Sequence, residues 1–467
     1  MNRPTRHARL SALLLAILVA MIASCSLGRE PSQSVQDKPN RLSYTSSDAT
    51  LSAEDAEKEA ISIMSTLKPG SLRGIDAIKA EVTPLYGCQP SALRSAEEAD
   101  APLAYLVNFK DDNGFAILSA NRNCPPILAI HPHGNLDPEK APDNPTLQML
   151  MERVEEYCLA SNEHTETIPD PKHPYNPDGT PIEEFRKVEY GPWRGIMTSS
   201  EKVLIPVVWG QEQSPYNTNI ARRFGIETMP AGCVPAAIAQ ILAFHKYPLQ
   251  IDGETFDWEA MRRHHPIYSP DEDYMPAYDY ISRLYEILGD KLKVTYRVEG
   301  SKVPLDNIAP VLTSLGYSVT HSDQYSYSAV CEEISPQGRD GYPLIICASA
   351  NKETHKKQFL WWKWEENYYT NAHAFILDGF KTLGRKVITY RKYDMPYSDW
   401  EKIDEKWEFS KMVRANLGWD DAMSNGYYNY CVFDTTVYPE LRSDYATYGK
   451  KGVYSYNIQL FTGIRPK

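Results

Sequence analysis

Apolar residues in the first third of the chain follow a helical spacing and then form two strand-like runs. Four of them recur at steps of three or four residues, which predicts an amphipathic helix over 53–66. The apolar runs 103–109 and 115–119 flank Asp111-Asp112-Asn113-Gly114, which favours a hairpin because Asn-Gly accepts the positive φ of tight turns. The helical positions are Ala53, Ala56, Ala60 and Met64.

A third strand and a second helix complete this part of the chain. Residues 126–130 predict the strand, and apolar positions repeating from Leu147 to Cys158 predict the helix. Residues 51–162 are therefore expected to form a small α+β domain. The polar, proline-rich residues 163–200 that follow predict a linker and an easily cleaved boundary.

Residues 201–467 are expected to form one larger domain. Its first part is helical and includes a helix over 277–288 that Gly289 is expected to end. Its second part is rich in β-branched and aromatic residues, which predicts strands. The strand candidates are 341–349, 372–380, 386–392 and 426–435. We predict an α+β fold class in which a helical lobe precedes a sheet lobe.

The first residues have the order of a secretory signal. Three arginines precede the apolar run Leu13–Ile22, which is too short to favour a membrane-spanning helix. Ile22-Ala23-Ser24-Cys25 resembles the bacterial lipobox, in which the cysteine is acylated. We predict a signal peptide over 1–24, lipidation of Cys25 and a tether over 25–50. The protein would then be an exported lipoprotein of the outer membrane or cell surface, released if processing separates it from the anchor. An ordinary signal peptide is the alternative.

Length, net charge and cysteine count limit the functions that the chain can have. The chain has 467 residues, enough for two or three folding units, and a formal net charge of −12. That charge argues against a broad basic surface for nucleic acid. There are eight cysteines. If Cys25 is lipidated, an odd number remains in an exported chain, which suggests a search for a reactive thiol.

Cys233 lies in the most informative segment, Ala231-Gly232-Cys233-Val234-Pro235. The apolar residues after it share one helical face, and Pro235 is tolerated in a first turn. Cys233 is therefore expected at a helix N-terminus, where unpaired N–H groups and the helix dipole favour the nucleophilic thiolate. A buried cysteine that caps a core helix is the alternative.

Three further segments carry side chains that suit a cysteine acyl-transfer site. His373 begins a half-buried strand and could exchange a proton with Cys233, although a structural histidine is the alternative. The Gln211 amide could join the Cys233 N–H in holding an oxyanion. Asn416 could accept a hydrogen bond from the imidazole, and Trp419 could shield that bond from water.

These segments resemble the streptopain family of bacterial cysteine peptidases, a branch of papain-like folds, over roughly 200–467. The resemblance implies a two-lobed domain with a helical lobe and an antiparallel sheet lobe. Residues 51–162 resemble the family's inhibitory propeptide, which implies an autoprocessed zymogen. The matching segments are Gln211, Pro215-Tyr216-Asn217, Gly232-Cys233-Val234, Ala239-Gln240-Ile241, His245-Lys246-Tyr247-Pro248, Phe256-Asp257-Trp258, His373-Ala374-Phe375, Gly418-Trp419, Gly426-Tyr427-Tyr428 and Gly463-Ile464-Arg465-Pro466, with Asn108-Phe109 and Gly114–Ala120 in the propeptide part.

The chain departs from the family pattern at four places. Leu417 replaces an aromatic residue that packs near the catalytic histidine, and Asp420-Asp421 replace a glycine pair. Pro235 stands where the family has a small residue. In place of a short hairpin, 42 residues lie between His373 and Asn416.

Three hypotheses follow. The favoured one is an exported cysteine endopeptidase zymogen in which His373 helps to form the Cys233 thiolate, with a resting thiolate–imidazolium pair as one version. Ala372 and Trp419 are expected to contact the protein or peptide substrate. The second hypothesis is a surface lipoprotein that keeps the fold and binds peptides without turnover, which Leu417 and the paired aspartates motivate. The third is a transamidase that uses the same dyad.

The sequence lacks the motifs of several other kinds of active site. The sequence contains no HExxH, GxxxxGK[ST] or GxSxG segment. His131-Pro132-His133 and His264-His265 have no well-spaced partners, and we interpret them as solvated loops. We therefore expect no cofactor and no metal. The expected partners are peptide substrates, the chain's own propeptide and, through the lipid anchor, a membrane, but no nucleic acid.

Overall fold

A computed structural model gives the structure of the chain. The chain divides into two compact units, Met1–Arg41 and Leu42–Lys467. All of the described residues lie in the second unit. The predicted lipidation site Cys25 and the helix predicted over 147–158 lie outside the described residues. The described residues are 50–67, 79–86, 102–122, 124–138, 184–198, 203–263, 275–298, 300–336, 341–359, 362–419, 425–433 and 456–467.

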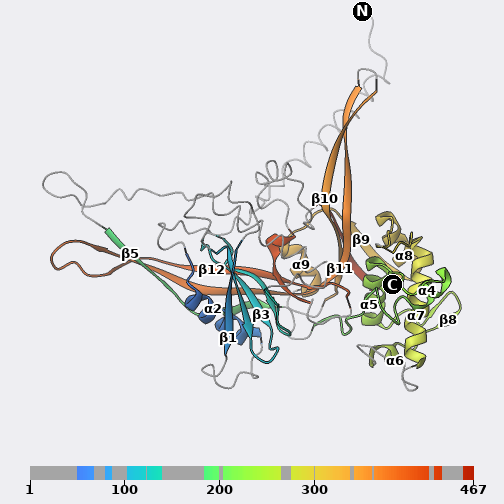
Figure 1. The fold of residues 1–467 in the computed structure, drawn as a ribbon, viewed down its shortest axis with the longest axis horizontal. Helices are drawn as coiled ribbons and strands as arrows, with labels where there is room; N and C mark the ends of the chain where they lie inside the picture. The colour runs from blue at the N-terminus through green and yellow to red at the C-terminus, as the bar shows by residue number, and fades with distance from the viewer. Residues whose placement is uncertain are drawn as a thin grey trace, which may run out of the picture. The chain divides into compact units, whose positions relative to one another are not determined.

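The N-terminal domain combines a helix with antiparallel strands (Figure 1). The Ser52 side chain caps the helix by accepting the Asp55 N–H, and the apolar face of the helix is buried. The predicted helix, hairpin and third strand are all confirmed. The elements are α2 (Ala53–Leu67), β1 (Ala80–Leu85), β2 (Ala104–Phe109), β3 (Phe115–Ser119) and β4 (Ile127–His131).

The turn between β2 and β3 differs in detail from the expectation. Its positive φ angles fall on Asp111, Asp112 and Gly114, and Asn113 has none. Gly114 also lies against β4, since a Cβ there would come within 2.1 Å of the His131 carbonyl oxygen. Glycine is therefore required at this position by both its φ and the close approach of the neighbouring backbone.

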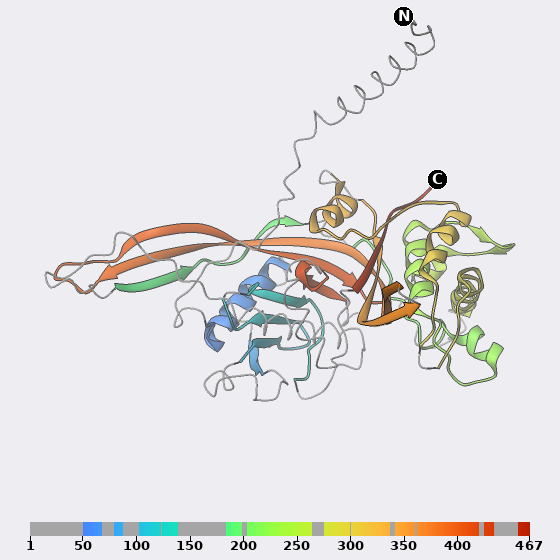
Figure 2. The ribbon, with the colours of Figure 1, turned by 90° about the horizontal axis from the view of Figure 1, so that it is seen from above.

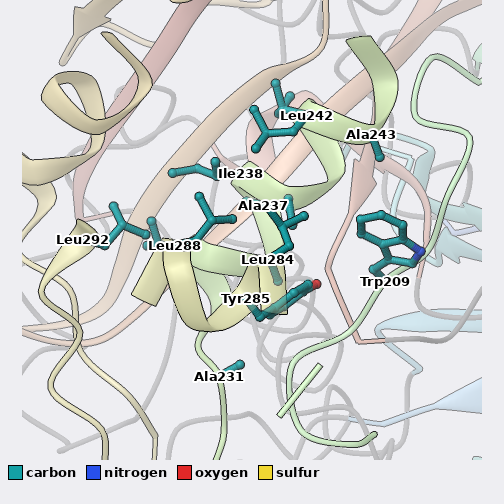
Figure 3. Close-up of a cluster of buried hydrophobic side chains, with 14 of the residues drawn as sticks. Trp209, Ala231, Ala237, Ile238, Leu242, Ala243, Leu284, Tyr285, Leu288 and Leu292 are labelled. Atoms are coloured by element: carbon teal, nitrogen blue, oxygen red, sulfur yellow. The ribbon is translucent and has the colours of Figure 1, made fainter. Parts of the chain in front are cut away.

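The helical lobe follows at the start of the larger domain. Its core forms where Ile238 and Leu242 of α5 pack among Leu284 and Leu288 of α7 (Figure 3). The elements are α4 (Thr218–Phe224), α5 (Cys233–His245), β7 (Gln250–Ile251), β8 (Glu254–Thr255), α6 (Trp258–Arg263), α7 (Met275–Leu292), η3 (Leu305–Asn307) and α8 (Ile308–Ser314).

The expected helix end at Gly289 is wrong. Helix α7 continues through this residue to Leu292. A Cβ at Gly289 would lie 1.8 Å from the Tyr296 hydroxyl. The glycine therefore allows the segment after the helix to pack closely against it, and the sequence signal for a stop reflects tertiary packing instead.

The sheet lobe is antiparallel and joins the N-terminal domain in one continuous sheet. Strand β13 pairs with β4, with Tyr427 opposite Ile130, so the described strands follow the order β1-β2-β3-β4-β13-β12-β11-β10-β14-β9. The α+β fold with a helical lobe and an antiparallel sheet lobe is thus present. The elements are β9 (Tyr317–Ser322), α9 (Tyr327–Ile334), β10 (Leu344–Phe359), β11 (Trp362–Tyr393), β12 (Glu401–Asn416), β13 (Gly426–Asn429), η6 (Tyr430–Val432) and β14 (Tyr456–Pro466).

Part of the predicted linker 163–200 is built into this sheet. Strands β5 (Glu184–Tyr190) and β6 (Arg194–Thr198) both pair with the C-terminal half of β11, whose N-terminal half pairs with β10 (Figure 2). On its other edge the C-terminal half of β11 pairs with β12. The sequence did not predict these two strands, because their partners lie about 200 residues away. The cleavage boundary itself remains a prediction.

Candidate active site

Cys233 is the first residue of helix α5, as predicted. Gly232 caps the helix with a φ of 102°, a conformation that L side chains rarely adopt. The Cys233 side chain is partly exposed and packs against the core of the helical lobe. Burial raises the pKa of its thiol, and hydrogen bonds from the N–H groups of Ala374, Cys233 and Val234 only partly oppose this.

The strand that carries His373 meets the N-terminus of α5. Ala374 of β11 donates its N–H to Cys233 Sγ, so the residue next to His373 contacts the thiol. His373 is 6% exposed. Its Nε2–H donates to the Leu417 carbonyl at 3.0 Å, and its ring stacks on Trp419 with the centroids 5.9 Å apart.

Burial favours the neutral form of the His373 imidazole. Burial lowers its pKa from 6.5 to about 4, while the hydrogen bond to the Leu417 carbonyl acts in the opposite direction. Burial also raises the pKa of Cys233, so both shifts favour the uncharged forms of the two side chains in the intact chain. The resting thiolate–imidazolium pair, one version of the favoured hypothesis, remains a prediction.

Gln211 is held close to Cys233 in space. Its carbonyl accepts the Ala231 N–H at 2.8 Å, two residues before Cys233. The loop is further fixed by the Tyr285 hydroxyl, which donates to the Gly210 carbonyl at 2.8 Å. The Gln211 side chain is 6% exposed. Its amide N–H group is of the kind that donates to an oxyanion.

Asn416 does not accept the hydrogen bond from His373 that the sequence suggested. Its amide nitrogen donates to the carbonyl of Val207 at 3.2 Å and to Gln240 Oε1 at 2.8 Å, while its oxygen accepts the Gly418 N–H at 3.2 Å. The Leu417 carbonyl and the Gly418 N–H belong to the same peptide group. Asn416 therefore orients the peptide group that in turn orients His373.

Sequence reasoning missed two residues that fix this peptide segment. Gln240, fully buried in α5, accepts from Asn416 and so links the helix of the nucleophile to the segment that holds the imidazole. Asn425 accepts the Leu417 N–H at 2.8 Å. The sequence did contain a hint of Gln240, because Ala239-Gln240-Ile241 is one of the segments that resemble the family. Asn425 stands just before the Gly426-Tyr427-Tyr428 segment and had no signal of its own.

The other predicted site residues divide into three groups. Ala372 is exposed and Trp419 is partly exposed, and their contact with substrate remains a prediction. Asp420-Asp421 and His264-His265 lie outside the described residues. His131 is not in a solvated loop: it is fully buried at the end of β4, stacks on Phe115 and meets the edge of Tyr428.

Two other kinds of feature are missing from the described residues. The described part of the chain holds no group of three or more His, Cys, Asp or Glu residues placed to bind a metal ion. None of the described helices combines the length and apolar character needed to cross a membrane.

Two family models match segments of the chain. Residues 209–428 match the Peptidase C10 family, and residues 48–158 match the Spi protease inhibitor family. The thiol protease/hemagglutinin PrtT of Porphyromonas gingivalis is 25% identical over 181 residues, which cover 37% of this chain and 19% of that protein. The chain thus spans about a fifth of the length of this relative. The narrower streptopain resemblance remains a prediction.

Two solved structures of Prevotella intermedia proteins are also similar. A fragment of prointerpain A is 17% identical with a TM-score of 0.45, and the match covers 83% of this chain and 100% of that one. Active interpain A, a cysteine protease, is 17% identical with a TM-score of 0.35 over 58% of this chain and 96% of that one.

Proposed function

Starting from a chain that carries a Peptidase C10 region behind a Spi protease inhibitor region, we propose that it is a cysteine endopeptidase made as a zymogen. The observation that carries the proposal is the contact between Cys233 at the start of α5 and the backbone beside His373. The order of the two matched regions supports an N-terminal domain that inhibits the enzyme until it is removed. Protein or peptide substrates follow from this activity.

The reaction uses Cys233 and His373 in succession. His373 takes the thiol proton, and the Sγ thiolate attacks the peptide carbonyl carbon. The Gln211 amide and the Cys233 N–H hold the resulting oxyanion. The imidazolium, held by the Leu417 carbonyl, protonates the leaving amine. Water activated by His373 then hydrolyses the thioester, which frees the acid product and restores the thiol.

Turnover of a fluorogenic peptide under reducing conditions tests this proposal. Purified chain that has processed itself should release the fluorophore, and Cys233→Ala should not. Gln211→Ala should lower kcat by about 100- to 1000-fold, the usual cost of losing an oxyanion donor. Equal turnover by Cys233→Ala and the unchanged chain would remove the proposal.

The inactive binding protein is the competing function. Leu417 and Asp420-Asp421 motivated it, but the imidazole uses the main-chain carbonyl of Leu417, which any residue at this position would supply. Labelling with an epoxide electrophile separates the two functions. Stoichiometric labelling of Cys233 in the processed chain supports the peptidase, whereas an unlabelled Cys233 in a folded chain that still binds peptide supports the binding protein.

The proposal extends to export and lipid anchoring of the chain. They rest on the order of charge, apolar run and Cys25 at the N-terminus. Radiolabelled palmitate should enter the chain in bacterial cells and should be lost in Cys25→Ser. A labelled Cys25→Ser chain would show that the fatty acid is attached elsewhere.

A further inference from the structure

A long arm, residues 381–411 of β11 and β12, projects from the strand that carries His373. It occupies most of the 42 residues between His373 and Asn416 that exceed the short hairpin of the resembled family. The base of the arm shares a buried core with the N-terminal domain. Leu383 of the arm and the neighbouring Met412 and Trp193 cluster there with Ala60 and Ile63 of α2. The inserted segment is therefore in contact with the inhibitor-like domain.

A buried arginine is at the centre of this contact. Arg385 is 1% exposed, and its guanidinium makes ion pairs with Glu59 of α2 at 2.7 Å and with Glu408 of the arm at 2.6 Å. It also lies 4.5 Å from the ring centroids of both Tyr190 and Trp193. Charge this deeply buried is rare in proteins without a close partner, because its removal from water is costly.

Glu59 is bound by several donors. Arg122, from the same N-terminal domain, pairs with Glu59 Oε1 at 3.0 Å, and the Trp193 indole N–H donates to Oε2 at 3.4 Å. One turn later on α2, the Ser62 hydroxyl oxygen accepts the Trp193 N–H at 3.0 Å. The arm and the segment beside it thus fit a helix that presents a carboxylate and a hydroxyl three residues apart.

Arg385 and Glu59 each have a second ion-pair partner on their own domain, so the contact between the domains can open without leaving either charge unpaired. If the two domains separate, Arg385 keeps Glu408 on the arm and Glu59 keeps Arg122 on its own domain. Neither charge is then left buried without a partner, which is the costly outcome for an ion pair. The docked state nevertheless gains the Arg385–Glu59 attraction in a site that is largely shielded from water.

We propose that the base of the arm adds a second docking surface for the N-terminal domain beside the β4–β13 pairing, and that Arg385 anchors it through Glu59. This inference rests on the proposed zymogen function. Opening of the contact precedes removal of the N-terminal domain, so its strength sets the rate of maturation.

The first experiment follows self-processing of the full-length chain by mass spectrometry over time. Glu59→Gln keeps the shape of the side chain and removes its charge, and it should speed processing by about tenfold or more. Glu54→Gln is the matched control, because Glu54 lies on the same helix, is 78% exposed and pairs with the surface residue Lys58. Its processing should stay within twofold of the unchanged chain.

Equal rates for Glu59→Gln and the unchanged chain would overturn the proposal, as would equal acceleration by Glu54→Gln. Both glutamates lie in the part that is removed, so the mature enzymes should have the same sequence. Turnover per labelled Cys233 must then be equal in all three preparations. An unchanged chain that neither processes nor labels would instead count against the proposed function.

Hydrogen exchange tests docking even if there is no catalysis. In a full-length Cys233→Ala chain, Glu59→Gln should raise exchange in α2 and β6, while β2 and β3 inside the N-terminal domain stay protected. Unchanged exchange in α2 and β6 would refute the anchor. Equal loss of protection in β2 and β3 would also refute it, because the substitution would then unfold the domain instead of undocking it.

Discussion

Replacing Asn416 with alanine tests how the imidazole is oriented. The side chain is 1% exposed and makes three hydrogen bonds, to Val207, Gln240 and Gly418. At about 1 kcal/mol net for each bond, the substitution should destabilise the fold by about 3 kcal/mol, and more if Gln240 Oε1 and the Gly418 N–H stay buried without partners. Denaturant unfolding in a Cys233→Ala background measures this without self-processing.

The kinetic consequence is separate from the loss of stability. Without Asn416 the 417–418 peptide is held less firmly, so kcat should fall by about tenfold or more. The acidic limb of the pH profile should stay in place, because the Leu417 carbonyl remains the acceptor for His373. A direct bond between Asn416 and the imidazole predicts the opposite, a displaced limb.

A matched control separates these effects. Asn429→Ala removes a similar set of three buried hydrogen bonds, to the Ile127 carbonyl, Ser410 and the Cys431 N–H. It should cost comparable stability and leave kcat of the processed enzyme unchanged. The reasoning fails if Asn416→Ala matches Asn429→Ala in kcat, or if its acidic limb moves.

Three further outcomes are expected. Because the pKa of His373 is about 4 in the folded chain against 6.5 when unperturbed, its contribution to stability is complete above pH 6.5 and is lost as pH falls towards 4, by at most about 3 kcal/mol. Unfolding of the Cys233→Ala chain should show this slope while His373 is present, and the slope should be absent once His373→Gln is added. Gly289→Ala should destabilise the fold despite better helix propensity, since its Cβ would meet the Tyr296 hydroxyl at 1.8 Å, and a neutral or stabilising result in thermal unfolding would contradict this. Gly232→Ala should slow epoxide labelling of Cys233 in the processed chain by strongly disfavouring the φ of 102° that caps α5, and unchanged labelling would count against that view.

The sequence predicted those features that depend on neighbours along the chain. Helix α2, the β2–β3 hairpin and the start of α5 at Cys233 each follow from spacing or from residues within one or two turns. Such signals are local because helices and tight turns are closed by hydrogen bonds between residues four or fewer positions apart. The position of the thiol at a helix N-terminus therefore follows from residue order alone.

What the tertiary structure decided involves distant residues or main-chain atoms. His131 is buried against Phe115 of β3 and Tyr428 of the distant strand β13, and the acceptor for His373 is a carbonyl that every residue carries. The Arg385–Glu59 pair joins residues more than 300 positions apart, from two elements whose charges look like ordinary surface charges in the sequence. Every residue has a backbone carbonyl, so the residue type does not reveal which carbonyl is an acceptor. The spacing of residues likewise does not reveal a contact between distant strands. These features therefore had to come from the folded chain.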